Sequence, residues 1–170
     1  MLGFGQNVYI TDANFKAYLV GSTSPSEINT NGDNEIQVSE AAAYAGTLDC
    51  NGLNISDLTG LETFTSIIKL YCDVNQLTSL DVSQNTALTN LFCHNNQITN
   101  LYLTQNIALV NLQCAQNYLT NFDLSQNLAL TTLGCEDNQL TSLDVSNNLA
   151  LTSLNCFNNQ LTSLDVSNNT

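Results

Sequence analysis

The sequence predicts a right-handed solenoid of short repeats behind a small helical cap at the N-terminus. Cysteines recur at a fixed interval, apolar and polar residues alternate around each cysteine, and the first 46 residues do not share this repeat. The alternation is typical of β-strands, so successive repeats are expected to add strands to one parallel sheet. Because each unit is only 21 residues long, little or no helix is expected in the repeats. The second half of each unit, L-D-V-S-x-N, is expected to form the extended opposite wall, with short β segments as an option.

The repeat is most visible in the cysteines, which are separated by one step of 22 residues and four steps of 21. They are Cys50, Cys72, Cys93, Cys114, Cys135 and Cys156. The full pattern is L-x-x-L-x-C-x-x-N-Q-L-T-x-L-D-V-S-x-N-x-A, and its units begin at Ile67, Leu88, Leu109, Leu130 and Leu151. One unit has too little apolar surface to fold alone, whereas stacked units bury a shared core.

The motif L-x-x-L-x-C-x-x-N-x-L resembles the leucine-rich-repeat signature, with cysteine in one leucine position. It covers residues 67–170 strongly and 47–66 weakly, and residues 53–62 resemble the rung that follows the helical cap of internalin-like proteins. The resemblance implies a solenoid with its parallel sheet on the concave face, in a secreted bacterial protein.

The chain is expected to divide into three parts: a leader or signal remnant at 1–6, a helical cap at 7–46 and the solenoid at 47–170, with 47–66 as a transitional rung. A first cap helix is expected at 11–20, started by Thr11 or Asp12. Its Phe15, Tyr18 and Leu19 would face the first rung. A breaker at 21–25 and a second helix at 39–44 follow.

Two columns of asparagine recur with the repeat. Members of the first column are expected to point inward and satisfy backbone groups where the chain bends after each strand. They are Asn75, Asn96, Asn117, Asn138 and Asn159. The second column either does the same on the other wall or simply favours turns. Its members are Asn85, Asn106, Asn127, Asn148 and Asn169.

The cysteines are expected to be free, buried thiols. Neighbouring parallel strands lie about 4.8 Å apart, which exceeds the usual disulfide Cβ separation of about 3.8 Å. A metal site would need ligands that converge on a point, whereas a repeat places these thiols along a line.

Residues 29–40 resemble the calcium loop of an EF-hand or dockerin. Asn29, Asn31, Asp33 and Glu40 correspond to loop positions 1, 3, 5 and 12, and Glu35 is a further candidate ligand. The sequence departs from the loop pattern where Asn29 replaces aspartate and where Asn34 replaces the glycine of position 6. The alternative is a polar turn without a metal, and no other cofactor is expected.

The composition excludes several classes of function. Lys16 and Lys69 are the only basic residues against fifteen carboxylates, and the net charge is −13. Such a chain repels phosphate backbones and anionic membranes, so we expect no nucleic-acid partner. No apolar run is long enough to span a bilayer, so no membrane insertion is expected. With one histidine and no nucleophile placed beside a base, no enzymatic activity is expected either.

The outward strand positions are the candidate binding surface, because they vary between repeats while the inward positions do not. One column reads Tyr71, Phe92, Gln113, Gly134 and Asn155, and the next reads Asp73, His94, Ala115, Glu136 and Phe157. Aromatic residues among amides and carboxylates are typical of surfaces that bind a protein or a glycan. Asp73 and His94 are expected to form a surface pair rather than a catalytic or metal-binding dyad.

The sequence therefore predicts a secreted or surface-attached binding or adhesion module. Two alternatives are a spacer or stalk with no ligand, and an ice-binding protein that uses an unbroken threonine column. That column is Thr78, Thr99, Thr120, Thr141 and Thr162. Residues 165–170 show no sign of a cap, so a fragment of a longer protein, or a dimer formed through this end, is also expected.

Overall fold

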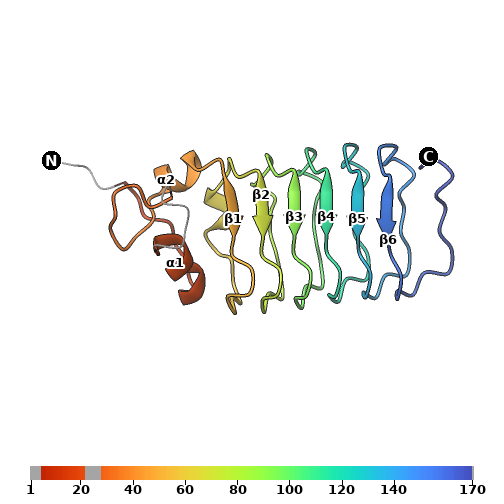
Figure 1. Cartoon of the computed structure of the whole chain (residues 1–170), viewed down its shortest axis with the longest axis horizontal. Coiled ribbons are helices and arrows are strands. Elements are labelled where there is room, and N and C mark those ends of the chain that lie inside the picture. Colours follow the sequence, from red (N-terminus) through yellow and green to blue (C-terminus); the bar gives the residue numbers. More distant parts are fainter. Residues whose placement is uncertain (1–4, 22–27, 170) are drawn as a thin grey trace.

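A computed structural model describes residues 5–21 and 28–169 and confirms the predicted solenoid with a parallel sheet. Its six strands pair in chain order, each parallel to the next, along the length of the molecule (Figure 1). The strands are β1 (Thr47–Asp49), β2 (Lys69–Tyr71), β3 (Asn90–Phe92), β4 (Asn111–Gln113), β5 (Thr132–Gly134) and β6 (Ser153–Asn155). Residues 1–4 of the predicted leader at 1–6, and residues 22–25 of the predicted breaker at 21–25, lie outside the described residues.

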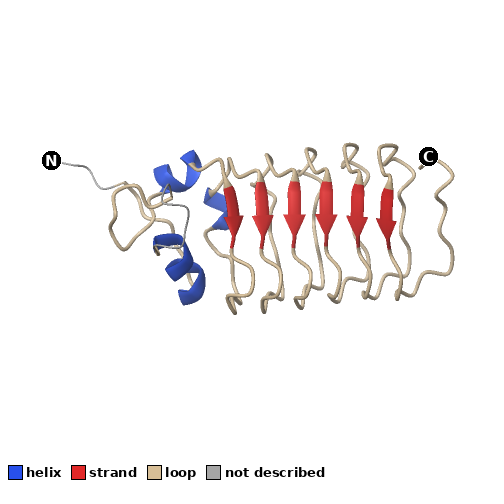
Figure 2. Cartoon of the chain, in the orientation of Figure 1, coloured by secondary structure: helices blue, strands red, loops and turns tan. Residues whose placement is uncertain are grey.

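Helices are confined to the N-terminal end, as Figure 2 shows. They are α1 (Ala13–Val20), α2 (Val38–Ala43) and a short 3-10 helix η1 (Leu61–Thr63) in the transitional rung. Within residues 67–169 the repeats contain no helix, as the short unit length predicts.

The register of the sheet stacks identical positions on one another. The central leucine of each strand aligns with that of the next, for example Leu91 with Leu112 and Leu112 with Leu133. These leucines and the cysteines two residues later are buried, except at the last strand, where Leu154 and Cys156 are half-buried. Each rung therefore adds the same two side chains to one continuous core. Burial of each such side chain stabilises the fold by roughly 1.5–3 kcal/mol. A single rung could not bury these side chains without its neighbours.

The first asparagine column, which we call the inner ladder, joins each rung to the one before it. Asn117 Oδ1 accepts the Ile98 amide at 2.9 Å, and its Nδ2 donates to the Cys93 carbonyl at 3.0 Å. The same Nδ2 also donates to the carbonyl of Cys114 in its own rung at 3.2 Å. Asn96, Asn138 and Asn159 repeat this pattern.

The second column also forms a ladder. Asn106 Nδ2 donates to the carbonyls of Val82 and Asn85 in the preceding rung, at 2.9 and 3.0 Å. Its Oδ1, like those of the other four members, is buried and finds no hydrogen-bond partner among the described residues. In the inner ladder both the oxygen and the nitrogen of each carboxamide form hydrogen bonds, whereas in the second ladder only the nitrogen does.

The second half of each unit differs from the expected short β segments. Among the described residues it contains one isolated parallel bridge, between Leu80 and Leu101, and no strand. Tight turns take the place of strand pairing: Ser83 N donates to Asp81 Oδ1 at 2.9 Å, and Asn85 N donates to the Val82 carbonyl at 3.0 Å. Aspartate, serine and asparagine at these positions favour local hydrogen bonds over an extended ladder.

The cap attaches to the first rung through α1. Asp12 Oδ1 accepts the amides of Asn14 and Phe15 at the start of the helix, while its Oδ2 accepts both the amide and the hydroxyl of Ser56 at 2.9 Å. The Tyr18 hydroxyl accepts the Asp49 amide at 2.8 Å. Phe15, Tyr18 and Leu19 are buried, so this helix covers the apolar end of the solenoid.

The bend after each strand requires a left-handed residue. Four of these positions are asparagine, glutamine or aspartate, but Val74 adopts φ 55° with its side chain about half exposed. A β-branched side chain is strained in this region, whereas asparagine tolerates it.

Loss of an inner-ladder asparagine is expected to destabilise the middle of the stack more than its end. Asn117 and Asn159 make equivalent bonds, but Asn117 is buried and Asn159 is partly exposed, so water can replace the bonds that Asn159 loses. Asn117→Ala should lower the free energy of unfolding by about 1–3 kcal/mol, and Asn159→Ala by less. Equal losses in thermal or urea melts would contradict this explanation.

Replacement of Val74 should relieve the strain at its bend. Val74→Asn is expected to raise the free energy of unfolding by about 1 kcal/mol, measured by urea denaturation. The matched reverse change, Asn95→Val at φ 59°, should lower it by a similar amount. If both variants shift stability in the same direction, backbone strain is not the cause.

Candidate functional site

The outer side of the sheet, which we call the sheet face, is formed by the outward strand positions and the residues just after each strand. Tyr71, Phe92 and Gln113 are half-buried, Asn155 is exposed, and Gly134 is buried beneath its neighbours. In the next column Asp73, His94 and Glu136 are half-buried, Ala115 is buried, and Phe157 is 60% exposed. The structure thus brings all eight predicted binding residues to one side of one sheet.

An aromatic pair occupies the N-terminal half of this face. The rings of Tyr71 and Phe92 stack with centroids 4.6 Å apart and planes 28° from parallel. The parallel register places them directly opposite each other on β2 and β3. Since both rings stay partly exposed, the stacked pair forms an apolar platform at the surface of the sheet.

Asp73 and His94 lie beside this platform. His94 Nε2 is 3.6 Å from Asp73 Oδ2, which places the two in contact across neighbouring rungs, as predicted. The described residues contain no group of three or more histidine, cysteine or acidic side chains arranged to share a metal ion. Among the described residues, Asp73 and His94 therefore have no third side chain beside them that could complete a metal site.

The C-terminal half of the face holds a different arrangement. At Gly134 an added Cβ would lie 2.1 Å from Gln113 Oε1 and 3.3 Å from Glu136 Oε2. The Gln113 carboxamide is oriented by a hydrogen bond from its Nε2 to Asn111 Oδ1 at 2.9 Å. The glycine thus leaves room for two oxygens of the sheet face to approach one point.

Two parts of the face were not predicted. A third outward column lies at the first strand position, and a cavity of about 520 Å³ lies where α1 meets β1, lined by Asn14, Ala17, Tyr18, Asp49 and Leu53. The third column is Lys69, Asn90, Asn111, Thr132 and Ser153. Strand alternation would have indicated this column, because its members lie two residues before Tyr71 and its equivalents and so share their side of the sheet. Asp49 of β1 also belongs to the sheet face, since it pairs with Tyr71 in the sheet. The cavity depends on how the cap docks, which no local pattern reveals.

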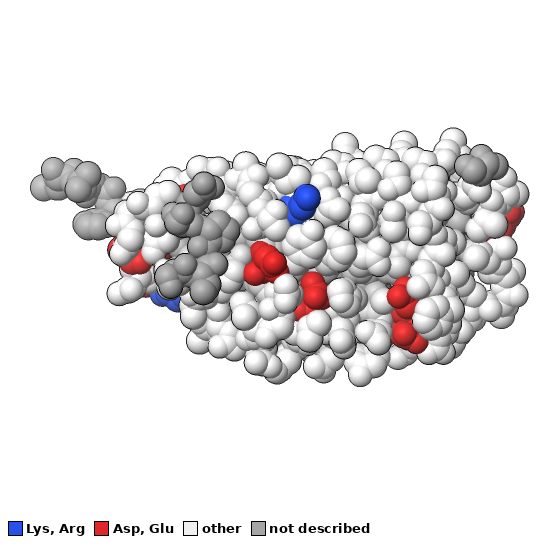
Figure 3. All heavy atoms as spheres, viewed as in Figure 1, with Lys and Arg blue, Asp and Glu red and all other residues white. Residues whose placement is uncertain are grey.

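The few charged groups of the sheet face are mostly acidic. Figure 3 shows carboxylates in several patches along the solenoid and a basic group on the same side. On this face the outward residues include Asp49, Asp73 and Glu136 against Lys69. The other lysine, Lys16, lies in the cap and pairs with Glu35 at 2.7 Å.

The predicted calcium loop is an ordered turn. Asn29 Oδ1 accepts the Gly32 amide, Asn31 Oδ1 accepts the Asp33 amide, and Asp33 Oδ1 accepts the Glu35 amide, at 2.7–3.0 Å. Glu35 pairs with Lys16, so its carboxylate points to the first helix.

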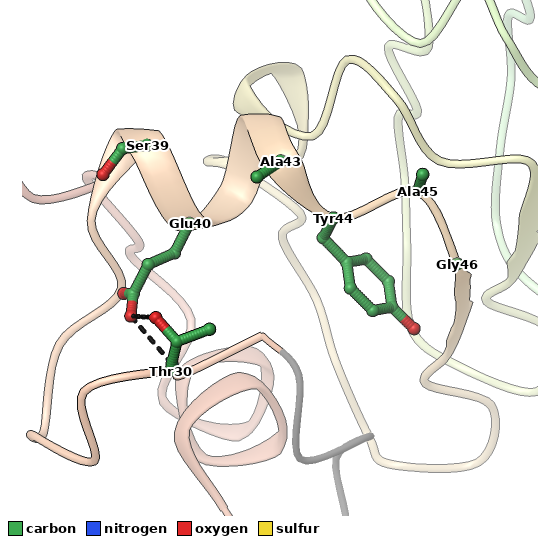
Figure 4. Close-up of a pocket in the computed structure, with 7 residues that line it drawn as sticks. All are labelled: Thr30, Ser39, Glu40, Ala43, Tyr44, Ala45 and Gly46. Atoms are coloured by element: carbon green, nitrogen blue, oxygen red, sulfur yellow. Dashed lines mark hydrogen bonds between the residues drawn. The ribbon is translucent and has the colours of Figure 1, made fainter.

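The Glu40 carboxylate already has several donors. Its Oε1 accepts the amide and hydroxyl of Thr30 (Figure 4). Oε1 also accepts the amide of Asn31, and Oε2 accepts the Gln37 amide. Burial acts to raise the pKa of Glu40, but these hydrogen bonds outweigh it and lower the pKa. A calcium ion would have to compete with them, and calcium binding by this loop remains a prediction.

A cavity of about 500 Å³ opens beside Glu40, lined also by Thr30, Ser39, Ala43 and Tyr44. Figure 4 shows the Tyr44 ring turned away from the carboxylate toward the start of the first rung. Its hydroxyl donates to the Thr47 carbonyl at 2.8 Å, so Tyr44 contributes to the junction between cap and sheet.

The cysteine column forms part of the core and not of the surface. All six cysteines are free, and five are fully buried while Cys156 is partly exposed. Burial raises the pKa of Cys93 to about 12, with a further contribution from the nearby charge of Asp73. Burial likewise raises the pKa of Cys50 and Cys135 to about 12. Neutral, inaccessible thiols of this kind are poor nucleophiles and metal ligands.

The raised pKa values of these thiols predict that the folded chain loses stability at alkaline pH. In the unfolded chain a thiol ionises near pH 8.5, but in the folded chain Cys93 stays neutral up to about pH 12. The contribution of these thiols to stability is complete below about pH 8.5 and is lost as the pH rises toward 12. Urea denaturation across this range should show the loss, and Cys93→Ala should reduce its slope. A flat profile would contradict the buried state of the column.

Known proteins support this architecture. A structure of the functional domain of InlJ from Listeria monocytogenes, described as including a cysteine ladder, is 30% identical, with a TM-score of 0.58 over 99% of this chain and 47% of its own. The chain has an internalin-type leucine-rich-repeat fold. An internalin structure from the same species aligns with a TM-score of 0.79 at 20% identity over 99% of this chain and 50% of its own, which supports the fold alone.

The internalin-type resemblance is also present in sequence. Internalin J of Listeria monocytogenes serotype 4b is 47% identical over 47 residues, which is 28% of this chain and 5% of internalin J. A leucine-rich-repeat protein structure from Leptospira interrogans is 25% identical over 61% of this chain and 29% of its own, with a TM-score of 0.57. The chain thus spans half or less of each of these relatives. No protein-family model matches it. In the part of the chain that the structure describes, no helix has the length and apolar character needed to cross a bilayer.

Proposed function

We propose that this internalin-type domain is a non-enzymatic adhesion or binding module that recognises a protein or glycan through its sheet face. The observation that carries the proposal is the contrast between the two sides of each strand. Inward positions repeat leucine and cysteine, whereas the outward positions change from the stacked Tyr71 and Phe92 to the exposed Phe157. Stability alone does not require this outward diversity.

The surface chemistry also supports a binding role. Aromatic side chains that are held rigidly and stay partly exposed provide contact area at a small entropic cost. The Tyr71–Phe92 platform meets this description, and polar groups that can orient a ligand surround it. The similarity to internalins further supports a secreted or surface location, which we include in the proposal.

A spacer with no ligand remains the principal alternative, and an ice-binding role is a weaker one. The five threonines of the column named above are all exposed. They form a single column, and one column of threonines is a narrow surface for binding ice. Association through the C-terminal end, where Leu164 and Val166 are partly exposed, also remains a prediction.

Removal of the aromatic platform should weaken ligand binding. Arrays of glycans and soluble proteins are probed with the wild-type domain, and every ligand found is titrated by calorimetry. The double variant Tyr71→Ala/Phe92→Ala should weaken binding by at least about tenfold, because buried aromatic anchors dominate such interfaces.

Tyr102→Ala is the matched control, since this tyrosine is 73% exposed but lies in the second half of its unit, away from the sheet. It should retain wild-type affinity. Equal effects of the two variants would contradict recognition by the sheet face. A domain that binds nothing on either array would favour the spacer.

A further inference from the structure

The C-terminal half of the sheet face contains a carboxylate oxygen that lacks a partner. Glu136 Oε2 is buried and accepts no hydrogen bond from the described residues. An unpaired polar atom of this kind costs roughly 1–3 kcal/mol, so a hydrogen-bond donor that reaches it gains more than it would in open solvent. Because the atom has almost no surface open to solvent, a donor reaches it only when the flexible Gln113 side chain beside it moves.

A second acceptor converges on the same point. Gln113 Oε1 and Glu136 Oε2 both lie within 3.3 Å of the position that a Gly134 Cβ would occupy. The Gln113 Nε2 donates to Asn111 Oδ1, which orients the Gln113 oxygen toward Gly134. Two oxygens, one of them on a carboxylate, therefore lie near one point, and no described residue donates to the carboxylate oxygen.

No basic group of the described residues is available to neutralise this pair. Lys16 is bound to Glu35 in the cap, and His94 lies against Asp73. Lys69 is on β2, three strands away from Gly134 on β5. A cation that pairs with the Glu136 carboxylate must therefore come from another molecule.

The chemistry favours an organic cation over a metal ion. Calcium takes six to eight oxygen ligands, and the described residues offer no cluster of three acidic, histidine or cysteine side chains here or elsewhere. An ammonium or guanidinium group needs only a few acceptors. The net charge of −13 and the acidic patches of the sheet face attract a basic partner.

We propose that Gln113, Gly134 and Glu136 form a subsite that binds the cationic end of a lysine or arginine side chain from a protein partner. The inference rests on the proposed function of the sheet face and names the class of partner. Asn111 is a positioning residue, since it orients the Gln113 carboxamide.

A labelled hexalysine peptide provides the probe, titrated by fluorescence anisotropy at low ionic strength. Glu136→Gln removes the charge with little change of shape, and Gly134→Ala displaces the Gln113 carboxamide, which is the far end of a flexible side chain. Each change should raise the Kd about tenfold, as expected for loss of a charge-assisted hydrogen bond.

Asp144→Asn is the matched control. It removes one negative charge from an exposed turn away from the sheet, where Asp144 Oδ1 accepts the Ser146 amide and an asparagine oxygen can do the same. Its effect on Kd should stay below about twofold. Equal effects of Glu136→Gln and Asp144→Asn, or no binding of hexalysine to the wild type, would overturn the subsite.

The same variants separate this inference from the proposed function. A ligand from the arrays that loses affinity in the aromatic double variant but not in Glu136→Gln would leave recognition by the sheet face intact and exclude the cation subsite. A ligand that binds both variants like the wild type would contradict both proposals.

Discussion

The inner asparagine ladder is the interaction on which the rest of the structure depends. Each solenoid turn must bend sharply after its strand, and the bend leaves backbone amides and carbonyls facing a dry interior, where unpaired groups are costly. One carboxamide satisfies both kinds of group and reaches into the preceding rung. The transitional rung has Leu53 in the ladder position, and Asn75 of the next rung accepts its Leu53 and Ile55 amides, so it is joined in the same way.

This interior arrangement leaves the outer surface free to vary. Since the ladders, leucines and cysteines determine the register, an outward residue can change without altering how rungs stack. Gly134 illustrates the freedom: the loss of a side chain at one outward position does not disturb the alignment of Leu133 with its neighbours, yet it changes which groups of the sheet face meet. Outward residues of a single rung can therefore change the binding surface while the stacking of the rungs stays the same.

Much of this architecture was predictable because it is local and periodic. The repeat predicted the sheet, the buried cysteines and the inward asparagines, and the cap residues Asp12 and Tyr18 followed from helix-capping and apolar patterns. The short β segments considered for the second half do not form among the described residues, because Asp81 and Ser83 form a turn whose local bonds compete with strand pairing. The convergence of Gln113 and Glu136 could not be predicted, since it depends on side-chain conformations on different strands.

Native-state amide hydrogen exchange tests the central role of the inner ladder most directly. The amides of Leu77, Ile98, Leu119 and Leu140 donate to carboxamide oxygens of the following rung, and all but the last of these bonds are fully buried. They should rank among the slowest-exchanging amides of the chain, with Leu140 faster than the other three. If these amides exchange as fast as those of the exposed turns while the strand amides stay protected, the ladder does not hold the rungs together.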